Sequence, residues 1–113
     1  MIHLVTAVIK PFKLEDVKDA LRSSGVLGMT VSEVQGYGRQ GGKSESFRGA
    51  EYAISFVPKV KLEILVETED VDKVMKLVAE TARTGKIGDG KIWAVPLDRV
   101  MRVRTGDLDE EAL

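Results

Sequence analysis

The chain has 113 residues, and its 17 basic and 18 acidic side chains leave a net charge of −1. This length predicts one domain spanning residues 1–113, and the balanced charge argues against a general nucleic-acid or membrane-surface binder. The absence of cysteine excludes disulfides and thiolate metal sites, and the lack of a membrane-length apolar run predicts a cytoplasmic protein that is not an integral membrane protein.

The first half of the chain predicts a strand, a helix and a second strand. Residues 2–9 (IHLVTAVI) are apolar on both faces and rich in β-branched side chains, as in a buried central strand, and Pro11 ends the run. The segment KLEDVKDALRSS then has one apolar helix face, and Gly25 supplies a left-handed stop. Residues 29–36 (MTVSEVQG) alternate and predict a strand that ends at Gly36. The apolar helix positions are Leu14, Val17 and Leu21.

The second half repeats the pattern. Residues 59–66 (KVKLEILV) predict a strand with one wetter face, and Thr68 is expected to cap the helix that follows. Residues 91–95 (KIWAV) predict a short strand that Pro96 breaks, and residues 101–104 (MRVR) are a candidate edge strand. The apolar positions are Val60, Leu62, Ile64 and Val66 on the strand and Val71, Val74, Met75, Val78 and Ala82 on the helix.

This order of elements predicts an α+β, ferredoxin-like βαββαβ fold, with a four-stranded antiparallel sheet and two helices on one face. The connection between strands 2 and 3, residues 37–58, is far longer than a hairpin needs. A long glycine-rich loop on a compact domain is typically functional, and a disordered insertion is the alternative. The acidic tail, residues 106–113, is expected to be flexible.

Catalysis has little support in the residues. The chain has one histidine, His3, which lies inside the first predicted strand, and it has no cysteine. No set of nucleophile, base and orienting residue is visible, so we expect no enzymatic activity. RNA recognition through this topology is also disfavoured, because the predicted central strands carry no aromatic side chains for base stacking.

The segment RTGKIGDGKIW, residues 83–93, combines glycines and lysines between the second helix and the last strand. It is not a P-loop, because its order is helix, loop, strand and because Ile92 follows Lys91 where Ser or Thr is required. A glycine-rich turn can still direct successive backbone N–H groups at an anion, with Lys86 and Lys91 adding charge. An ordinary turn between helix and strand is the alternative.

Six segments taken together, in this order and at this spacing, resemble the PII signal-transduction family of nitrogen regulators. They are KPFKLEDV, GMTVSEVQGYGRQ, RGAEY, VPKVK, TGKIGDGKIW and RVRTG, and they cover the chain from Lys10 to Thr105. The resemblance implies a homotrimer of ferredoxin-like subunits that regulates nitrogen metabolism and binds ATP or ADP in clefts between subunits.

In that family, one subunit contributes a glycine run and the strand end before the long loop to the nucleotide site. The neighbouring subunit contributes a Gly-Met-Thr turn, a glutamate and two arginines. The matching residues are Gly36, Tyr37, Gly38, Arg39, Gly88, Asp89, Gly90 and Lys91 from one subunit and Gly28, Met29, Thr30, Glu63, Arg102 and Arg104 from its neighbour.

The resemblance also implies that 2-oxoglutarate binds through the Mg²⁺ of Mg-ATP, with Gln40 as a metal ligand and Lys59 paired with the keto acid. The long loop matches the family's partner-binding T-loop. Tyr52 in it resembles the tyrosine that receives a uridylyl or adenylyl group, and Arg48 the arginine with which some members block an ammonium channel. The expected partners are an ammonium transporter, which would recruit the protein to the membrane, a nucleotidylyltransferase or metabolic enzymes.

The chain departs from the family mainly inside this loop. Phe47 stands where a tyrosine is common, residues 41–45 (GGKSE) replace the usual Lys-Gly-His-Thr-Glu, and Ala50 replaces a serine that some relatives phosphorylate. These changes concern the partner rather than the ligand sites. A PII-like regulator that binds nucleotide with a different second effector is the alternative function.

Overall fold

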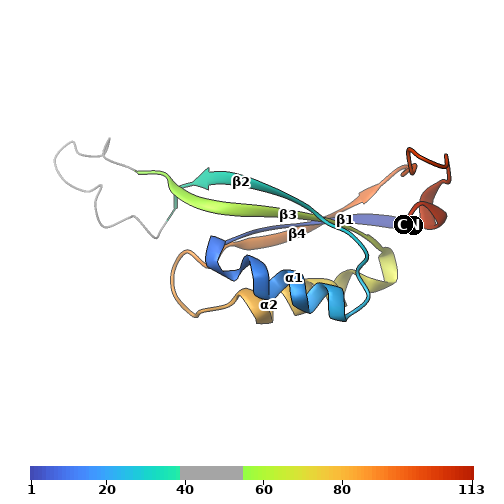
Figure 1. The fold of residues 1–113 in the computed structure, drawn as a ribbon. Helices are drawn as coiled ribbons and strands as arrows, with labels where there is room; N and C mark the ends of the chain where they lie inside the picture. Colours follow the sequence, from blue (N-terminus) through green and yellow to red (C-terminus); the bar gives the residue numbers. More distant parts are fainter. Residues whose placement is uncertain (39–54) are drawn as a thin grey trace.

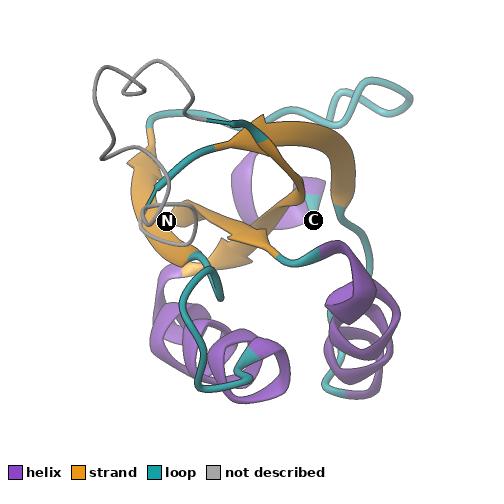
Figure 2. Ribbon diagram, turned by 90° about the vertical axis from the view of Figure 1, so that its left-hand side faces the viewer, coloured by secondary structure: helices purple, strands orange, loops and turns teal. Residues whose placement is uncertain are grey.

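Four antiparallel strands form one sheet in the order β2-β3-β1-β4, and two helices cover one of its faces (Figures 1 and 2). The structure is a computed structural model that describes residues 1–38 and 55–113. The elements are β1 (Ile2–Ile9), η1 (Pro11–Lys13), α1 (Leu14–Ser23), β2 (Thr30–Gly36), β3 (Val57–Glu67), η4 (Thr68–Asp70), α2 (Val71–Ala82), β4 (Lys91–Leu97) and η5 (Asp109–Ala112). The expected ferredoxin-like α+β fold is confirmed. Because β3 begins at Val57, the interval between β2 and β3 is residues 37–56.

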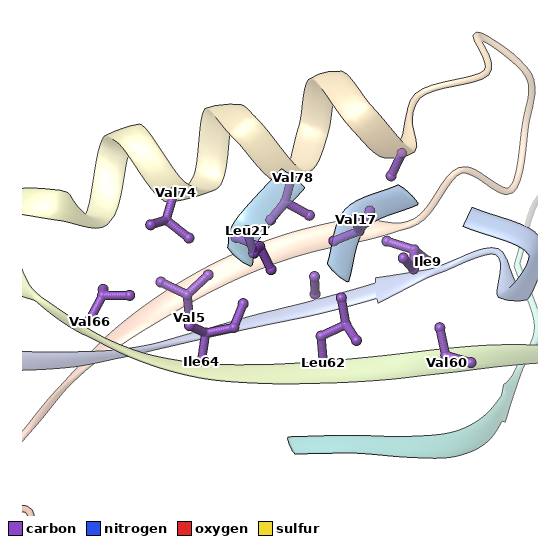
Figure 3. Packing of buried hydrophobic residues seen from close by; sticks show 12 residues of the cluster. Val5, Ile9, Val17, Leu21, Val60, Leu62, Ile64, Val66, Val74 and Val78 are labelled. Carbon is purple, nitrogen blue, oxygen red and sulfur yellow. The ribbon is translucent and has the colours of Figure 1, made fainter. Parts of the chain in front are cut away.

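The core lies between the helices and the covered face of the sheet (Figure 3). Alternate residues of β1 and β3 point into it, as the period of two predicts, and the apolar stripes of α1 and α2 meet them. The predicted apolar positions of β3 are all buried, and those of α2 are buried or packed against the core. The buried cluster is Val5, Ala7, Ile9, Val17, Leu21, Val60, Leu62, Ile64, Val66, Val74, Val78 and Ala82.

The ends of the two helices differ in how well the sequence predicts them. After α1, Gly25 has φ +101° and the Val26 N–H donates to the Leu21 carbonyl (3.0 Å), which is the predicted left-handed stop. The predicted Thr68 cap is wrong. A 3-10 turn, η4, precedes α2, and the Thr68 hydroxyl donates to the Met1 carbonyl (3.1 Å), so it ties β1 to η4 rather than capping the helix.

The chain after β4 also departs from expectation. Pro96 does not break the strand, because β4 is an edge strand of the described sheet and an edge position tolerates a missing N–H donor. Residues 101–104 add no edge strand; Met101 instead forms an isolated bridge with Leu108. The tail, residues 106–113, ends in η5 and places Glu110 against the N-terminal ammonium of Met1, and its flexibility stays a prediction.

Neither α1 nor α2 lies on the second face of the sheet (Figure 2). Register places an apolar row across it, because Leu4 lies opposite both Leu65 on β3 and Val95 on β4. Trp93, opposite Thr6, adds a large ring on the same face, and 45% of its surface is exposed.

None of the helices in the described residues is long and apolar enough to cross a membrane.

Candidate functional site

The loop between α2 and β4 is organised around the Asp89 carboxylate. The backbone N–H groups of Thr84 (2.8 Å) and Gly85 (2.9 Å) donate to it, as does the Thr84 hydroxyl. Lys10, at the end of β1, forms an ion pair with Asp89 (3.2 Å) and a hydrogen bond to the Thr84 hydroxyl (3.2 Å). The Thr84 hydroxyl and backbone bonds, then the Gly85 bond and Lys10, hold the pKa of Asp89 far below its usual range against a partial desolvation effect.

This arrangement divides the amides of the loop into two groups. The first ones, at Thr84 and Gly85, are occupied by the internal carboxylate. Among the residues that the structure describes, no acceptor engages the backbone N–H groups of Gly88 or Gly90, whereas Ile87 and Gly88 form a hydrogen-bonded turn that ends at Asp89. The Asp89 side chain shapes the loop, so any share of Asp89 in a phosphate site falls to its backbone.

Gly90 is fixed by its neighbour in the sheet. Its φ is +104°, and a Cβ built on it would lie 1.8 Å from the Val8 carbonyl oxygen of β1. Gly85, in the same loop, also has a positive φ (+87°), but a Cβ there would meet nothing within 4 Å. The loop thus approaches β1 so closely at Gly90 that only glycine fits.

Lys59 reaches this loop from the start of β3. Its side chain is buried, with 8% of the residue exposed, and its ammonium donates to the Gly88 carbonyl. Burial lowers the pKa of Lys59, and the charge of Lys10 lowers it further, whereas Asp89 opposes the change. Two lysines and one carboxylate therefore meet at the end of the sheet, where a second carboxylate would balance the charge.

The end of β2 borders the same region. Gly36 pairs with Val57, and the Tyr37 ring packs edge-on against Phe56, with 5.5 Å between centroids. Figure 1 shows this strand end and the α2–β4 loop at the same end of the molecule. The remaining residues predicted here, Arg39, Gln40, Arg48 and Tyr52, lie outside the described residues.

A second group of predicted residues gathers in a hollow of about 490 Å³ near the start of β2. Gly28, Met29 and Thr30 line it together with Glu63, which lies directly opposite Thr30 in the β2–β3 pairing. The last residues of the chain, Ala112 and Leu113, also line this hollow.

The two predicted arginines differ in their surroundings. Arg102 is held by the tail: it pairs with Asp107 (3.3 Å) and donates to the main-chain oxygens of Glu111 (2.9 Å) and Leu113 (3.2 Å). Arg104 is exposed, and no acceptor in residues 1–38 or 55–113 engages its side chain.

The predicted site residues thus form two groups rather than one. Thr30 and Gly36 stand at opposite ends of β2, about 20 Å apart at the rise of a strand. The first group comprises Gly36–Gly38, Lys59 and Gly88–Lys91, and the second comprises Gly28–Thr30, Glu63 and Arg102. No three or more His, Asp or Glu side chains in the described part of the chain gather as metal ligands would.

Lys10 and Thr84 lie at the centre of the loop network, and the residue patterns of the sequence do not predict either of them as a site residue. Lys10 ends a strand just before a proline, and nothing in that position indicates a partner 79 residues away at Asp89. Thr84 offers the one local signal, a hydroxyl residue at the start of a glycine-rich turn that also contains an aspartate.

Comparisons with known proteins agree over nearly the whole chain. A family model described as "Nitrogen regulatory protein P-II" matches residues 2–107. The nitrogen regulatory protein GlnK of Escherichia coli (strain K12) is 56% identical over 110 residues, covering 97% of this chain and 98% of the relative. The nitrogen regulatory protein P-II of Rhizobium etli is 54% identical over 110 residues, with the same coverage of 97% and 98%. A crystal structure of Arabidopsis thaliana PII bound to citrate is similar with a TM-score of 0.82 and 39% identity, over 99% of this chain and 92% of that one.

Proposed function

This chain belongs to the nitrogen regulatory protein P-II family. On that premise we propose that it is a homotrimeric sensor that binds ATP or ADP together with 2-oxoglutarate and controls partner proteins through the loop of residues 37–56. Its relatives are named as regulatory proteins, and it is a regulator rather than an enzyme.

The observation that carries the proposal is the meeting of Lys59 with the α2–β4 loop. A buried ammonium donates to the Gly88 carbonyl beside backbone amides that have no acceptor in the described residues. Such a site offers N–H donors for phosphate oxygens and a separate cation for a carboxylate. A nucleoside triphosphate has the phosphate oxygens that such N–H donors bind, and a dicarboxylic keto acid has the carboxylate that the cation binds.

The nucleotide phosphates are assigned to the amides of Gly88, Asp89 and Gly90 and to Lys91, with Gly36, Tyr37, Gly38 and Arg39 completing the share of one subunit. Hydrogen bonds to charged groups contribute about 1.5–3 kcal/mol each. Several of them are enough for micromolar affinity, which corresponds to about −8 kcal/mol.

The remaining share of the nucleotide site is assigned to the neighbouring subunit. Gly28, Met29 and Thr30 lie at the start of β2, about one strand length from Gly36 at its end. With Glu63, which pairs with Thr30, they are therefore assigned to a second chain that would bring the two groups together. The apolar row on the uncovered sheet face supports such an assembly, because monomeric proteins seldom expose large apolar patches. Three subunits related by a closed rotation would make three equivalent sites.

The second ligand is assigned to Lys59 and Gln40. Mg²⁺ keeps few protein ligands when phosphate oxygens and water supply the others, so Gln40, the nucleotide and the keto acid would together complete its coordination. Lys59 would pair with a carboxylate of 2-oxoglutarate. Replacing Gln40 by alanine tests this assignment: the affinity of the Mg-ATP form for 2-oxoglutarate should fall, and an unchanged affinity would place that ligand elsewhere.

The partner-binding surface is assigned to the loop of residues 37–56. It would act on an ammonium transporter, a nucleotidylyltransferase or a metabolic enzyme, with Arg48 as a contact and Tyr52 as the site of uridylyl or adenylyl transfer. The protein would work in the cytoplasm and would move to the membrane where the partner is a transporter. Incubation with a nucleotidylyltransferase and labelled nucleotide, with Tyr52→Phe as control, tests the modification.

A subunit-mixing experiment tests whether the nucleotide site is shared. Lys91→Gln and Arg104→Gln each change an exposed side chain from a different half of the proposed site. Each variant alone should bind ATP weakly, because every site has one damaged half. Trimers reassembled from an equal mixture should recover about a quarter of the wild-type sites, since each site takes one half from each of two neighbours.

The outcomes separate the claims. Mixed trimers that bind no more ATP than either parent variant would contradict the shared site. Unchanged protein that binds no ATP would contradict the sensor function itself. Nucleotide binding without any response to 2-oxoglutarate would favour the alternative, a PII-like regulator with a different second effector.

A further inference from the structure

The chain end holds the Arg102 side chain at three points. Asp107 pairs with Nη1, and Nη2 donates to the main-chain oxygens of Glu111 and Leu113. All the acceptors recorded for this guanidinium in the described residues come from the tail. Arg102 and Arg104 therefore differ, because the guanidinium of Arg104 has no such partner.

The position of these bonds matters for phosphate recognition. A guanidinium offers two edges with paired donors, one formed by Nη1 and Nη2 and the other by Nε and Nη2. Bidentate binding of a phosphate uses one of these edges. Both edges need Nη2, and the two hydrogens of Nη2 are directed to Glu111 and Leu113. While the tail holds Nη2, Arg102 has no complete edge for a phosphate.

The tail is supported by contacts that do not involve Arg102. Met101 bridges Leu108, the Asp109 N–H donates to the Val100 carbonyl (2.7 Å), and Arg99 pairs with Asp109 (3.3 Å). These contacts fix the chain up to residue 109, so the last residues need only a small movement to release Nη2. The tail also carries negative charge at Asp107 and at residues 109–111, which disfavours a phosphate nearby.

We propose that the end of the chain, residues 111–113, is an intramolecular competitor for Arg102 that lowers nucleotide affinity until a phosphate displaces it. This inference rests on the proposed function, in which Arg102 contacts the nucleotide held by the neighbouring subunit. The tail would regulate that site, because the nucleotide must first displace the tail from Arg102. The apparent affinity is then reduced by the fraction of chains whose tail is closed.

Shortening the chain after Glu110 tests the competition. The change removes both main-chain acceptors of Nη2 and leaves the Met101–Leu108 bridge and the Asp109 contacts in place. ATP binding, measured by calorimetry on the trimer, should become tighter by about threefold to tenfold. The shortened chain should keep the circular dichroism spectrum of the full chain.

Two backgrounds serve as matched controls. In Arg102→Gln the same shortening should leave the ATP affinity unchanged, because there is no guanidinium to release. In Arg104→Gln it should still tighten binding by the same factor, because the tail does not engage that residue. Shortening that leaves wild-type affinity unchanged, or weakens it, would overturn the proposal while the proposed function stands.

A second measurement uses the full chain and needs no variant. Carboxypeptidase should remove Leu113 faster when ATP is present, because the nucleotide frees the chain end from Arg102. A rate that is unchanged or slower with ATP contradicts displacement. Absence of ATP binding by both the full and the shortened chain would instead contradict the proposed function, and the inference with it.

Discussion

At the scale of single residues, Asp89 and Lys59 show how charge is distributed in the loop. The Asp89 carboxylate accepts hydrogen bonds from the loop around it, and Lys10 balances its charge. Lys59 has a carbonyl partner but no carboxylate of its own in the described residues, and it is buried. The Asp89 carboxylate therefore stabilises the loop, whereas the Lys59 ammonium is available to a ligand.

The pH dependence of stability tests the structural role of Asp89. Its pKa is lower in the folded chain than the usual unfolded value of about 3.9. Below that value the unfolded chain binds more protons, so the stabilising contribution of Asp89 is present above it and is lost as pH falls toward the folded pKa. Asp89→Asn removes this dependence.

Urea unfolding at several pH values between 5 and 3 provides the measurement for Asp89→Asn. The wild-type chain should be the more stable at pH 5, and its advantage over the variant should shrink as pH falls. An advantage that stays constant or grows over this range would contradict the assignment.

At the scale of elements, the approach of the α2–β4 loop to β1 sets the shape of the candidate site. The chain turns at Gly90 with a positive φ against the Val8 carbonyl and enters β4 at the next residue, Lys91. This contact fixes the loop relative to the sheet end where Lys59 emerges. The loop is thus positioned by the backbone of its neighbour strand as well as by its own hydrogen bonds.

Two alanine substitutions distinguish the effect of the close contact between Gly90 and β1 on stability from the effect of backbone strain at a positive φ. Gly90→Ala places a methyl group where the Val8 oxygen lies and should destabilise the fold by about 4 kcal/mol or more. Gly85→Ala has a similar backbone angle but open space, and should cost only about 1–2 kcal/mol. Chemical denaturation measures both, and equal losses would show that contact with β1 is unimportant.

The periodic segments of the sequence predicted the fold because each buries one regular face. The stripes on α1, α2 and β3 were confirmed, and so was the stop at Gly25. The errors arose where distant contacts decide the outcome. Thr68 bonds to Met1 instead of capping α2, and Pro96 remains in a strand because β4 lies at the edge of the described sheet.

The candidate site was predictable by resemblance and only partly by residue pattern. The glycine run indicated an anion site, yet the split between occupied and open amides depends on Asp89, whose role required coordinates. The partners of Lys10 and Arg102 likewise could not be predicted from the sequence, because the packing of the α2–β4 loop and of the tail determines them. Arg39, Gln40, Arg48 and Tyr52 remain predictions.

At the scale of the whole molecule, the helices protect one face of the sheet and leave the other to a partner. The row Leu65–Leu4–Val95 and the ring of Trp93 cross three strands on that uncovered face. A trimer would bury these side chains and would join the two groups of candidate site residues that a single chain keeps apart. Assembly and ligand binding are therefore expected to depend on each other.

Sedimentation equilibrium tests the assembly with one substitution and one control. The unchanged protein should have three times the chain mass of 12.4 kDa. Trp93→Glu places a charge on the uncovered sheet face and should dissociate the trimer and abolish ATP binding. Phe12→Glu alters an aromatic residue that is 70% exposed in η1 and should change neither. A Trp93→Glu protein that remains trimeric would contradict this interface.

The coupling between the two ligands is the central claim, and titration calorimetry of 2-oxoglutarate into the protein tests it most directly. With Mg-ATP present, binding should be measurable, and 2-oxoglutarate should tighten ATP binding by the same factor by which Mg-ATP tightens that of 2-oxoglutarate. Without Mg-ATP, binding should be much weaker or absent. Equal binding of 2-oxoglutarate with and without Mg-ATP would contradict the account.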